Sequence, residues 1–515
     1  MSPTALGRLC AALLACHLSA HAEQPYVAPL RPGPFTSEAA SFQQYRAPDW
    51  FRDAKFGIWS HWGPQAVPRD GDWYARNMYI QGQPQYQHHL EHYGHPSKSG
   101  YKDIIPLWKA ERFDPDALMA LYVKAGARYF VSMGVHHDNF DLWNSHYHRW
   151  NAVNMGPHRD IVGDWQRAAK KYGLPFGVSE HLGASYAWLA PSHGHDETGP
   201  LAGVPYDGAD PAYQELYHPA HNEGLHGNLD NWYATSPAWH EEWFQRISDL
   251  IDNYHPDLLY SDGGLPFDAV GRTLLANYYN GNMALHGGQL TAVYNHKSQG
   301  SGASGADDGV LDVERGVMND IQPQPWQTDT SIGDWFYSDN YHYKSTPEVI
   351  YMLADIVSKN GNLLLNVVQY ADGSLPPESR QFLDQMAAWM ATNSEAIYGT
   401  RPWKIYGEGP TRHDAGPMKE NASYTAQDIR FTAKGDAVYA ITLGEPSGQV
   451  TIRAFGKRSA YAGAAIRSVR LLGAAAPLQW TQRDDALVVT LPQRLPTAYA
   501  AALKIELSAP AVASR

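Results

Sequence analysis

Two acidic residues follow short apolar segments at points where the chain must turn. Asp262 ends the segment Asp257-Leu-Leu-Tyr-Ser-Asp262, and Gly263-Gly264 then lets the backbone bend away from the carboxylate. Glu314 lies on a loop after the next apolar segment, within Gly309-Val-Leu-Asp-Val-Glu-Arg-Gly316. Two carboxyl groups that face each other can act as nucleophile and acid/base in the cleavage of an acetal. Either residue alone is also compatible with a plain turn or surface position.

Histidines form the second group of residues that could do chemistry. His61, His136 and His137 each follow an apolar segment, a position that zinc enzymes built on barrels also use. The first of these segments carries no His-x-His pair, which such zinc sites would combine with a later carboxylate and histidine set. Neutral imidazoles also bind hydroxyl groups well. We therefore expect no metal or other cofactor, and a metal-dependent hydrolase stays open as an alternative.

Alternating segments must position these side chains. Short apolar runs alternate with amphipathic helical ones from about Phe56 to Val368, which predicts parallel strands joined by crossover helices. Such a (β/α)8-like TIM barrel carries its active site at the carboxyl ends of its strands. Most expected strands run directly into polar or aromatic residues, as this fold requires. The expected strands are Phe56–Ser60, Tyr129–Met133, Phe176–Ser179, Leu258–Ser261, Leu290–Asn295 and Leu363–Val367.

Two helices can be predicted with their ends. Pro347 and Glu348 suit the first turn of a helix, whose apolar stripe stops at Asn360-Gly361. A second helix is expected over about Pro377–Thr392. Two long segments rich in Gly, Asp and His, His193–Trp232 and Gly300–Gly309, are expected as loops over the active site or as surface padding.

The character of the chain changes after Gly399. Short strands separated by Gly, Pro and Asp turns replace the helical segments, which predicts a smaller C-terminal β-sandwich. The expected strands there are Val438–Leu443, Val450–Ala454, Ile466–Leu472 and Ala486–Leu491.

The first residues have the pattern of a secretory leader. Arg8 precedes the apolar run Leu9–Leu18, and Ala20-His21-Ala22 has the small-x-small form of a cleavage site. We expect a signal peptide over 1–22, a catalytic barrel over 23–398 and the β-sandwich over 399–515, with a periplasmic or extracellular destination. Lipid attachment at Cys16 is a less favoured alternative. Both cysteines, Cys10 and Cys16, lie in the leader, so the mature chain must be stabilised by packing.

The composition argues against several kinds of partner. The formal net charge of −13, without a basic patch, argues against nucleic acid. No segment after the leader approaches the roughly 18 uninterrupted apolar residues that membrane insertion requires. Aromatic residues reach 12% of the chain, and their flat faces suit sugar rings, although most are expected in the core.

Motifs spread over most of the chain resemble the α-L-fucosidase family, glycoside hydrolase family 29. They occur in the family's order, which makes a chance match very improbable. The motifs are Trp50-Phe-Arg-Asp-Ala-Lys-Phe-Gly-Ile-Trp-Ser-His-Trp-Gly63, Trp73-Tyr-Ala-Arg-Asn-Met-Tyr79, His136-His-Asp-Asn-Phe-Asp-Leu-Trp143, Ser358-Lys-Asn-Gly-Asn-Leu-Leu-Leu-Asn366 and Glu395-Ala-Ile-Tyr-Gly-Thr-Arg-Pro-Trp403.

The resemblance implies a barrel followed by a β-sandwich, and a retaining, exo-acting hydrolase of terminal α-L-fucose on oligosaccharides or glycoconjugates, without a catalytic metal. Asp262 matches the family's nucleophile, and Glu314 is the best match for its acid/base. Asp307, Asp308, Asp312 and Glu180 remain competitors for the second role. The family's sugar pocket carries over to His61, Asp72, Trp73, His136 and His137, with Lys297 where an Arg is usual and Trp335 as a wall for the C5 methyl group.

Several positions depart from the family's pattern. Asp72 stands where Glu is usual, Tyr260 stands where Trp is usual, and Ser179-Glu180-His181 replaces aromatic residues often found there. The linkage preference therefore cannot be inherited from the family. Two other functions stay open: a catalytically inactive sugar-binding protein on the same barrel, and a hydrolase of a related α-L-glycoside such as an L-galactoside.

Overall fold

A computed structural model describes residues 24–221, 232–297, 302, 307–420, 422–461 and 463–511. The expected signal peptide with Cys10 and Cys16 lies outside the described residues. Most of the expected loop Gly300–Gly309 and part of His193–Trp232 lie outside them as well.

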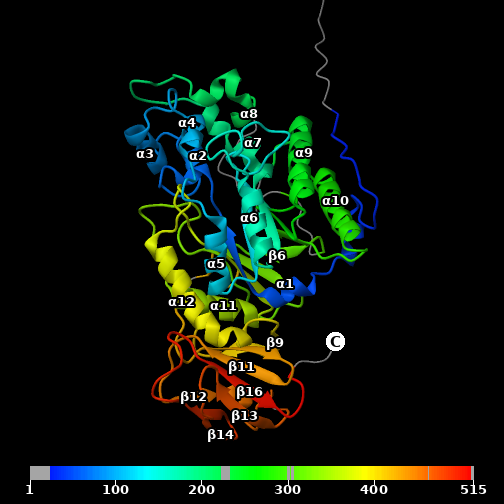
Figure 1. Cartoon of the computed structure of the whole chain (residues 1–515), viewed down its shortest axis with the longest axis vertical. Coiled ribbons are helices and arrows are strands. Elements are labelled where there is room, and N and C mark those ends of the chain that lie inside the picture. Colours follow the sequence, from blue (N-terminus) through cyan, green and yellow to red (C-terminus); the bar gives the residue numbers. More distant parts are fainter. Residues whose placement is uncertain are drawn as a thin grey trace, which may run out of the picture.

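Eight parallel strands close into a barrel in sequence order, and β1 pairs with β8. The expected TIM barrel is therefore confirmed. Figure 1 shows the barrel in the upper part of the molecule with helices packed around it. The strands are β1 (Phe56–Ser60), β2 (Tyr129–Val135), β3 (Phe176–Glu180), β4 (Leu258–Ser261), β5 (Val293–Lys297), β6 (Val310–Asp312), β7 (Trp326–Ser331) and β8 (Gly361–Asn366).

Two barrel strands, β6 and β7, were missing from the expected set, and the limits of β5 were wrong by two or three residues. β6 has only three residues, and β7 reads Trp326-Gln-Thr-Asp-Thr-Ser331, which lacks an apolar run. All six residues of β7 are nevertheless buried. Most of their polar side chains find hydrogen-bond partners in distant segments, as Gln327 does with Tyr129 and Asp312, a condition that only the folded chain can meet.

Helices cover the outside of the barrel. The expected helix after Pro347 is α11, where the Glu348 carboxylate accepts a hydrogen bond from the Ser345 backbone N–H at 2.6 Å and so caps the first turn. Among the described residues, the β5–β6 and β6–β7 connections form no helix. The helices are α1 (Asp49–Ala54), α2 (Tyr74–Asn77), α3 (Pro84–His92), α4 (Tyr101–Ile104), α5 (Pro115–Ala125), α6 (Ile161–Lys171), α7 (Ser185–Trp188), α8 (Gln214–Tyr217), α9 (Pro237–Tyr254), α10 (Ala269–Leu285), α11 (Thr346–Ser358) and α12 (Pro377–Asn393). None of those in the described ranges has the length and apolar character needed to cross a bilayer.

Two antiparallel sheets share a second apolar core at the C-terminal end. The order of the larger sheet is β13-β16-β11-β10-β9, and that of the smaller is β12-β15-β14. Sequence analysis missed β9, β10, β14 and β16, while the boundary at 398/399 stays a prediction. The strands are β9 (Arg401–Glu408), β10 (Ile429–Lys434), β11 (Ala437–Thr442), β12 (Gln449–Ile452), β13 (Ile466–Leu471), β14 (Gln479–Gln482), β15 (Leu487–Thr490) and β16 (Ala502–Leu507).

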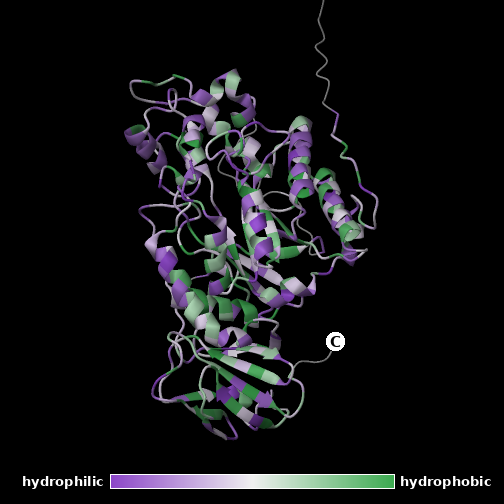
Figure 2. Cartoon of the chain, viewed as in Figure 1, coloured by the Kyte–Doolittle hydropathy of each residue, from purple (hydrophilic) through white to green (hydrophobic). Residues whose placement is uncertain are grey.

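Helix α11 lies between the barrel and the C-terminal sheets (Figure 1). Figure 2 shows it as mainly hydrophobic, whereas the outer helices α3 and α9 are largely hydrophilic. A buried polar contact fixes the interface: Asp355 on α11 pairs with Arg430 on β10 at 2.5 Å and with Lys359 at 2.8 Å. Two cations offset the cost of burying this carboxylate, and they hold its pKa below the usual range despite burial.

A buried ion pair holds the loop that follows β2. The Arg246 guanidinium on α9 donates to the Asp141 carboxylate and to the Asn139 side-chain oxygen, both at 2.6 Å. The side chains of Arg246 and Asp141 are fully buried. The pair ties the segment after His136-His137 to the barrel wall, so it helps to fix where these two histidines point.

We expect Arg246→Met to lower the free energy of unfolding by about 3–5 kcal/mol, because it leaves the Asp141 carboxylate buried without its partner. The loss should grow as the pH rises above 6, since the orphaned carboxyl must stay protonated to remain buried. Urea unfolding followed by tryptophan fluorescence measures both effects. Arg458→Met is the control, because Arg458 and Asp484 form an exposed pair that contributes less than about 1 kcal/mol. Equal stability of both variants would contradict this account.

Candidate active site

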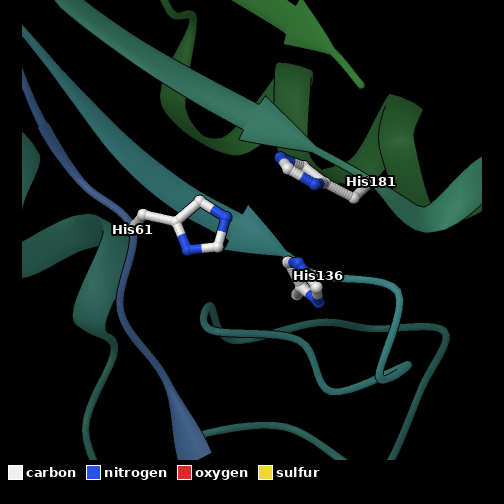
Figure 3. A group of neighbouring side chains, drawn as sticks. All are labelled: His61, His136 and His181. Atoms are coloured by element: carbon white, nitrogen blue, oxygen red, sulfur yellow. The ribbon is translucent and has the colours of Figure 1, made fainter. Parts of the chain in front are cut away.

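The carboxyl ends of the barrel strands bring the expected site residues together. His61 follows β1, His136 and His137 follow β2, and Asp262 follows β4. Lys297 ends β5, and Glu314 stands two residues after β6. Figure 3 shows His61 and His136, with His181 after β3, projecting from neighbouring strand ends toward a common space. Residues far apart in the sequence thus line one pocket.

The Lys297 ammonium lies between the two expected catalytic carboxylates. Its Nζ is 2.5 Å from Asp262 Oδ1 and 2.6 Å from Glu314 Oε2. These two oxygens can therefore be no farther apart than the sum, about 5.1 Å. The side chains are largely buried, so the attraction is only weakly screened by solvent. The three groups form one electrostatic unit.

The second oxygen of Asp262 faces two imidazoles. His137 Nε2 and His181 Nδ1 both lie 3.2 Å from Oδ2. Burial alone would raise the pKa of Asp262, but the Lys297 ammonium, His181 and His137 hold it well below the usual range. Asp262 is therefore ionised at neutral pH, as a nucleophile must be.

A second pair of carboxyls, Asp312 and Asp329, lies beneath the Lys297 ammonium. Asp329 on β7 is 3.7 Å from Nζ and accepts a hydrogen bond from the Tyr260 hydroxyl at 3.1 Å. Burial, reinforced by the neighbouring Asp312, raises the pKa of Asp329 well above its usual range. Burial also raises the pKa of Asp312. Like charges so close cannot both ionise readily, so we expect the pair to retain a proton.

Three buried histidines of the pocket are uncharged at neutral pH. Burial, with repulsion from neighbouring groups, lowers the pKa of His61 and His136 well below 6.5. Burial likewise lowers the pKa of His181, to about 4. Gln65 fixes the ring of His136 through a 2.8 Å hydrogen bond to Nδ1. Neutral imidazoles can both donate to and accept from hydroxyl groups, which suits a sugar.

The loop before α2 carries Asp72 and Trp73. The Asp334 carboxylate occupies the space beside Gly71 that any side chain there would need, and it accepts a hydrogen bond from the Asp72 backbone N–H at 3.3 Å. Trp73 adopts a left-handed backbone conformation with φ of 62°, which is costly for a bulky residue and is common at functional sites. Asp72 Oδ1 lies 3.7 Å from His136 Nε2. The loop thus presents both residues to the histidines.

Trp335 forms an aromatic wall next to His61. The two ring centres are 5.3 Å apart, and the Arg315 guanidinium lies over the indole at 5.0 Å. The Asn366 side chain, at the end of β8, accepts from the His61 backbone N–H at 3.0 Å and donates to the Trp335 carbonyl at 2.9 Å. One amide therefore positions both residues.

The competitors of Glu314 are placed less suitably. Both oxygens of Glu180 are engaged in the barrel wall, with Ser261, Trp243 and the Leu182 backbone. The carboxylate of Asp312 is held by Gln327 and the Asp329 backbone. Asp307 is exposed, whereas Asp308 is buried and its backbone carbonyl accepts a hydrogen bond from the Tyr279 hydroxyl. Of these five residues, Glu314 is the one that contacts the Lys297 ammonium at hydrogen-bonding distance.

Comparison with known protein families shows which family the chain belongs to. A model of the α-L-fucosidase family matches residues 24–395, and a model of the α-L-fucosidase C-terminal domain matches 421–506. The chain belongs to the α-L-fucosidase family. It is therefore a glycoside hydrolase, an α-L-fucosidase.

Relatives span nearly the whole fucosidase. The tissue α-L-fucosidase of Macaca fascicularis is 28% identical over 91% of this chain and 89% of its own length. The plasma α-L-fucosidase of Homo sapiens is 29% identical over 88% of this chain and 87% of its own length. The crystal structure of Thermotoga maritima α-fucosidase in complex with a mechanism-based inhibitor aligns with a TM-score of 0.71 and 26% identity, covering 92% of this chain and all of that one.

Two residues of the fucosidase pocket were not among the predicted site residues. His181 was expected near the end of a strand and as a departure from the family, but was not assigned to the site, although its position directly after β3 was a usable signal. Asp329 was missed because its strand was missed. A Thr- and Ser-rich segment with one central Asp resembles a loop until its partners are known.

Lys297→Met should move the acid limb of the kcat/KM profile to higher pH. Without the ammonium, burial is opposed only by the imidazoles, so the pKa of Asp262 rises, by roughly 1–3 units for loss of one close opposite charge. Hydrolysis of an aryl fucoside across a pH series measures the shift. Lys297→Arg keeps the cation and should leave the limb near its original position. An unchanged limb in Lys297→Met would mean that the ammonium does not control the nucleophile.

Proposed function

We propose that this fucosidase is exo-acting and cleaves terminal α-L-fucose with retention of configuration, through a covalent intermediate on Asp262. The observation that carries the proposal is the shared contact of Asp262 and Glu314 with Lys297. It keeps the facing oxygens no more than about 5.1 Å apart, too close for the roughly 6.5–9.5 Å that inverting enzymes need to admit a water, and so favours the closer carboxyls of a retaining enzyme.

The chemistry follows from the two environments. The ionised Asp262 attacks the anomeric carbon while the glycosidic C–O bond breaks, and protonated Glu314 donates its proton to the leaving oxygen. Glu314, now a carboxylate, then removes a proton from water as the water oxygen displaces Asp262 from the same carbon. Lys297 stays charged throughout, because Asp262, Asp329 and Glu314 raise its pKa well above the usual value despite burial.

Recognition of the sugar is assigned to the groups around this pair. The buried His61, His136 and His137 and the half-buried Asp72 supply donors and acceptors for ring hydroxyls, and Trp335 supplies an apolar wall for the methyl group. The description of a related Thermotoga maritima structure as a complex with fucose supports a fucose-sized pocket. A sugar lacking a matched hydroxyl would leave a buried polar group unpaired, at a cost of about 1–3 kcal/mol.

Asp262→Gly should abolish hydrolysis, because it removes the carboxylate that forms the covalent intermediate. Azide added to this variant should restore product as the inverted fucosyl azide, since azide enters the space of the lost carboxylate in a single displacement. Nuclear magnetic resonance of the product gives the configuration. Retained fucosyl azide from this variant would refute Asp262 as the nucleophile.

Glu314→Ala should slow substrates with poor leaving groups far more than activated aryl fucosides, by about 10²–10⁴-fold, because only the former need a proton. Azide should here give a retained product, since the nucleophile is intact. Asp312→Asn serves as the matched control, because this buried carboxyl ends β6, two residues before Glu314, and does not contact Lys297 at hydrogen-bonding distance. Intact turnover of natural oligosaccharides by Glu314→Ala would show the assignment to be wrong.

The destination of the enzyme is proposed from its first residues. The charged Arg8, the apolar run Leu9–Leu18 and the following small residues support export through a cleaved signal peptide, to the periplasm or the medium. Fucosylated oligosaccharides or glycoconjugates outside the cytoplasm are then the proposed substrates.

A further inference from the structure

One oxygen of the nucleophile stands in a set of donors that suits a transition metal. Asp262 uses Oδ1 to bind Lys297, whereas Oδ2 faces His137 Nε2 and His181 Nδ1, each at 3.2 Å. We infer that His137, His181 and Asp262 form a binding site for Zn²⁺ or a similar divalent transition metal, and that the metal excludes the sugar when it is bound. The inference rests on the proposed role of Asp262 for its effect on turnover, but not for the binding itself.

The hydrogen bonds of His137 expose the nitrogen that a metal needs. Its Nδ1 lies 2.7 Å from the His181 backbone carbonyl, which can only accept, so Nδ1 carries the proton. Nε2, the other ring nitrogen, then faces Asp262 Oδ2 at 3.2 Å. Metal-binding histidines commonly hold their other ring N–H against a carbonyl or carboxylate in this way. Two acceptors that face each other at 3.2 Å require something positive between them, either a proton or a metal ion.

His181 is a buried imidazole without hydrogen bonds. Neither ring nitrogen has a hydrogen-bond partner among the described residues, and the side chain is only 4% exposed. Its Nδ1 faces Asp262 Oδ2 at 3.2 Å, and a metal ion between these two atoms would satisfy both.

The spacing also suits coordination. Bonds of about 2.1 Å at tetrahedral angles place neighbouring ligand atoms roughly 3.4 Å apart, close to the 3.2 Å from Oδ2 to each imidazole. All three ligand atoms lie within 4.8 Å of one another, so a small ring rotation completes the set. His181 also belongs to a second group of possible ligands with His61 and His136, which lie within the same limit (Figure 3). The Lys297 ammonium opposes a further cation, so we expect weaker binding than at a structural zinc site.

Co²⁺ spectroscopy and calorimetry test the site without turnover. Chelator-treated full-length enzyme is titrated with CoCl₂ for visible absorption and with ZnCl₂ for heat. We expect the intense absorption of four-coordinate Co²⁺, one Zn²⁺ per chain, and displacement of both by saturating L-fucose. His181→Phe should lose the band and bind Zn²⁺ at least about tenfold more weakly, and His181→Asn is the second variant if the first does not fold.

The matched control is His146→Asn. His146 lies 2.6 Å from the Asp249 carboxylate, and its side chain is mostly exposed. The variant therefore removes one histidine beside one carboxylate, outside the proposed metal site. This control should leave the Co²⁺ band and the Zn²⁺ affinity unchanged. Zn²⁺ should inhibit hydrolysis of an aryl fucoside competitively, whereas chelator should not reduce it.

Binding that persists in both His181 variants, or that L-fucose does not displace, would overturn the inference, as would an absence of binding. If the enzyme hydrolyses fucosides but binds no metal, the metal site is refuted and the proposed function is not. If the enzyme binds the metal but its Asp262→Gly variant still forms a retained product, the proposed mechanism is refuted and the metal site is not.

Discussion

A single buried cation organises the active site. The Lys297 ammonium touches both Asp262 and Glu314 and lies 3.7 Å from a third carboxyl, Asp329. Carboxylates that close to one another would repel, and at least one would take up a proton, if no positive charge lay between them. The ammonium keeps Asp262 ionised in a buried position and holds the Glu314 carboxyl close to it.

Hydrogen bonds hold polar groups at several strand ends around that cation, as Asn366 does between His61 and Trp335. The connection between β9 and β10 takes part as well. Glu420 accepts a hydrogen bond from Thr330 on β7 at 2.6 Å and pairs with Lys344 at 2.8 Å, while the Met418 N–H donates to the carbonyl of Glu314. The acid/base loop therefore depends on residues beyond the barrel.

Burial gives the histidines of the pocket two capacities. Because desolvation disfavours the imidazolium, His61, His136 and His181 remain neutral donors and acceptors at neutral pH, which suits sugar hydroxyls. The same neutral nitrogens are good ligands for transition metals. A pocket shaped for a sugar has in this chain acquired the donors of a metal site.

The sequence alone determined the barrel and most of the residues that line the pocket. Apolar strands such as β1 and β4 can be recognised in the sequence. The polar residues directly after them must meet at one rim of the barrel, because parallel strands all end on the same side. What only the tertiary structure decided was how those side chains pair. The polar sequence of β7 resembles that of a loop. Its residues can be buried because the Asp312 carboxylate accepts hydrogen bonds from the Gln327 side chain and the Asp329 backbone. The sequence also could not show that Lys297 bridges two carboxylates or that His181 faces Asp262. Distances between strands far apart in the chain depend on closure of the barrel.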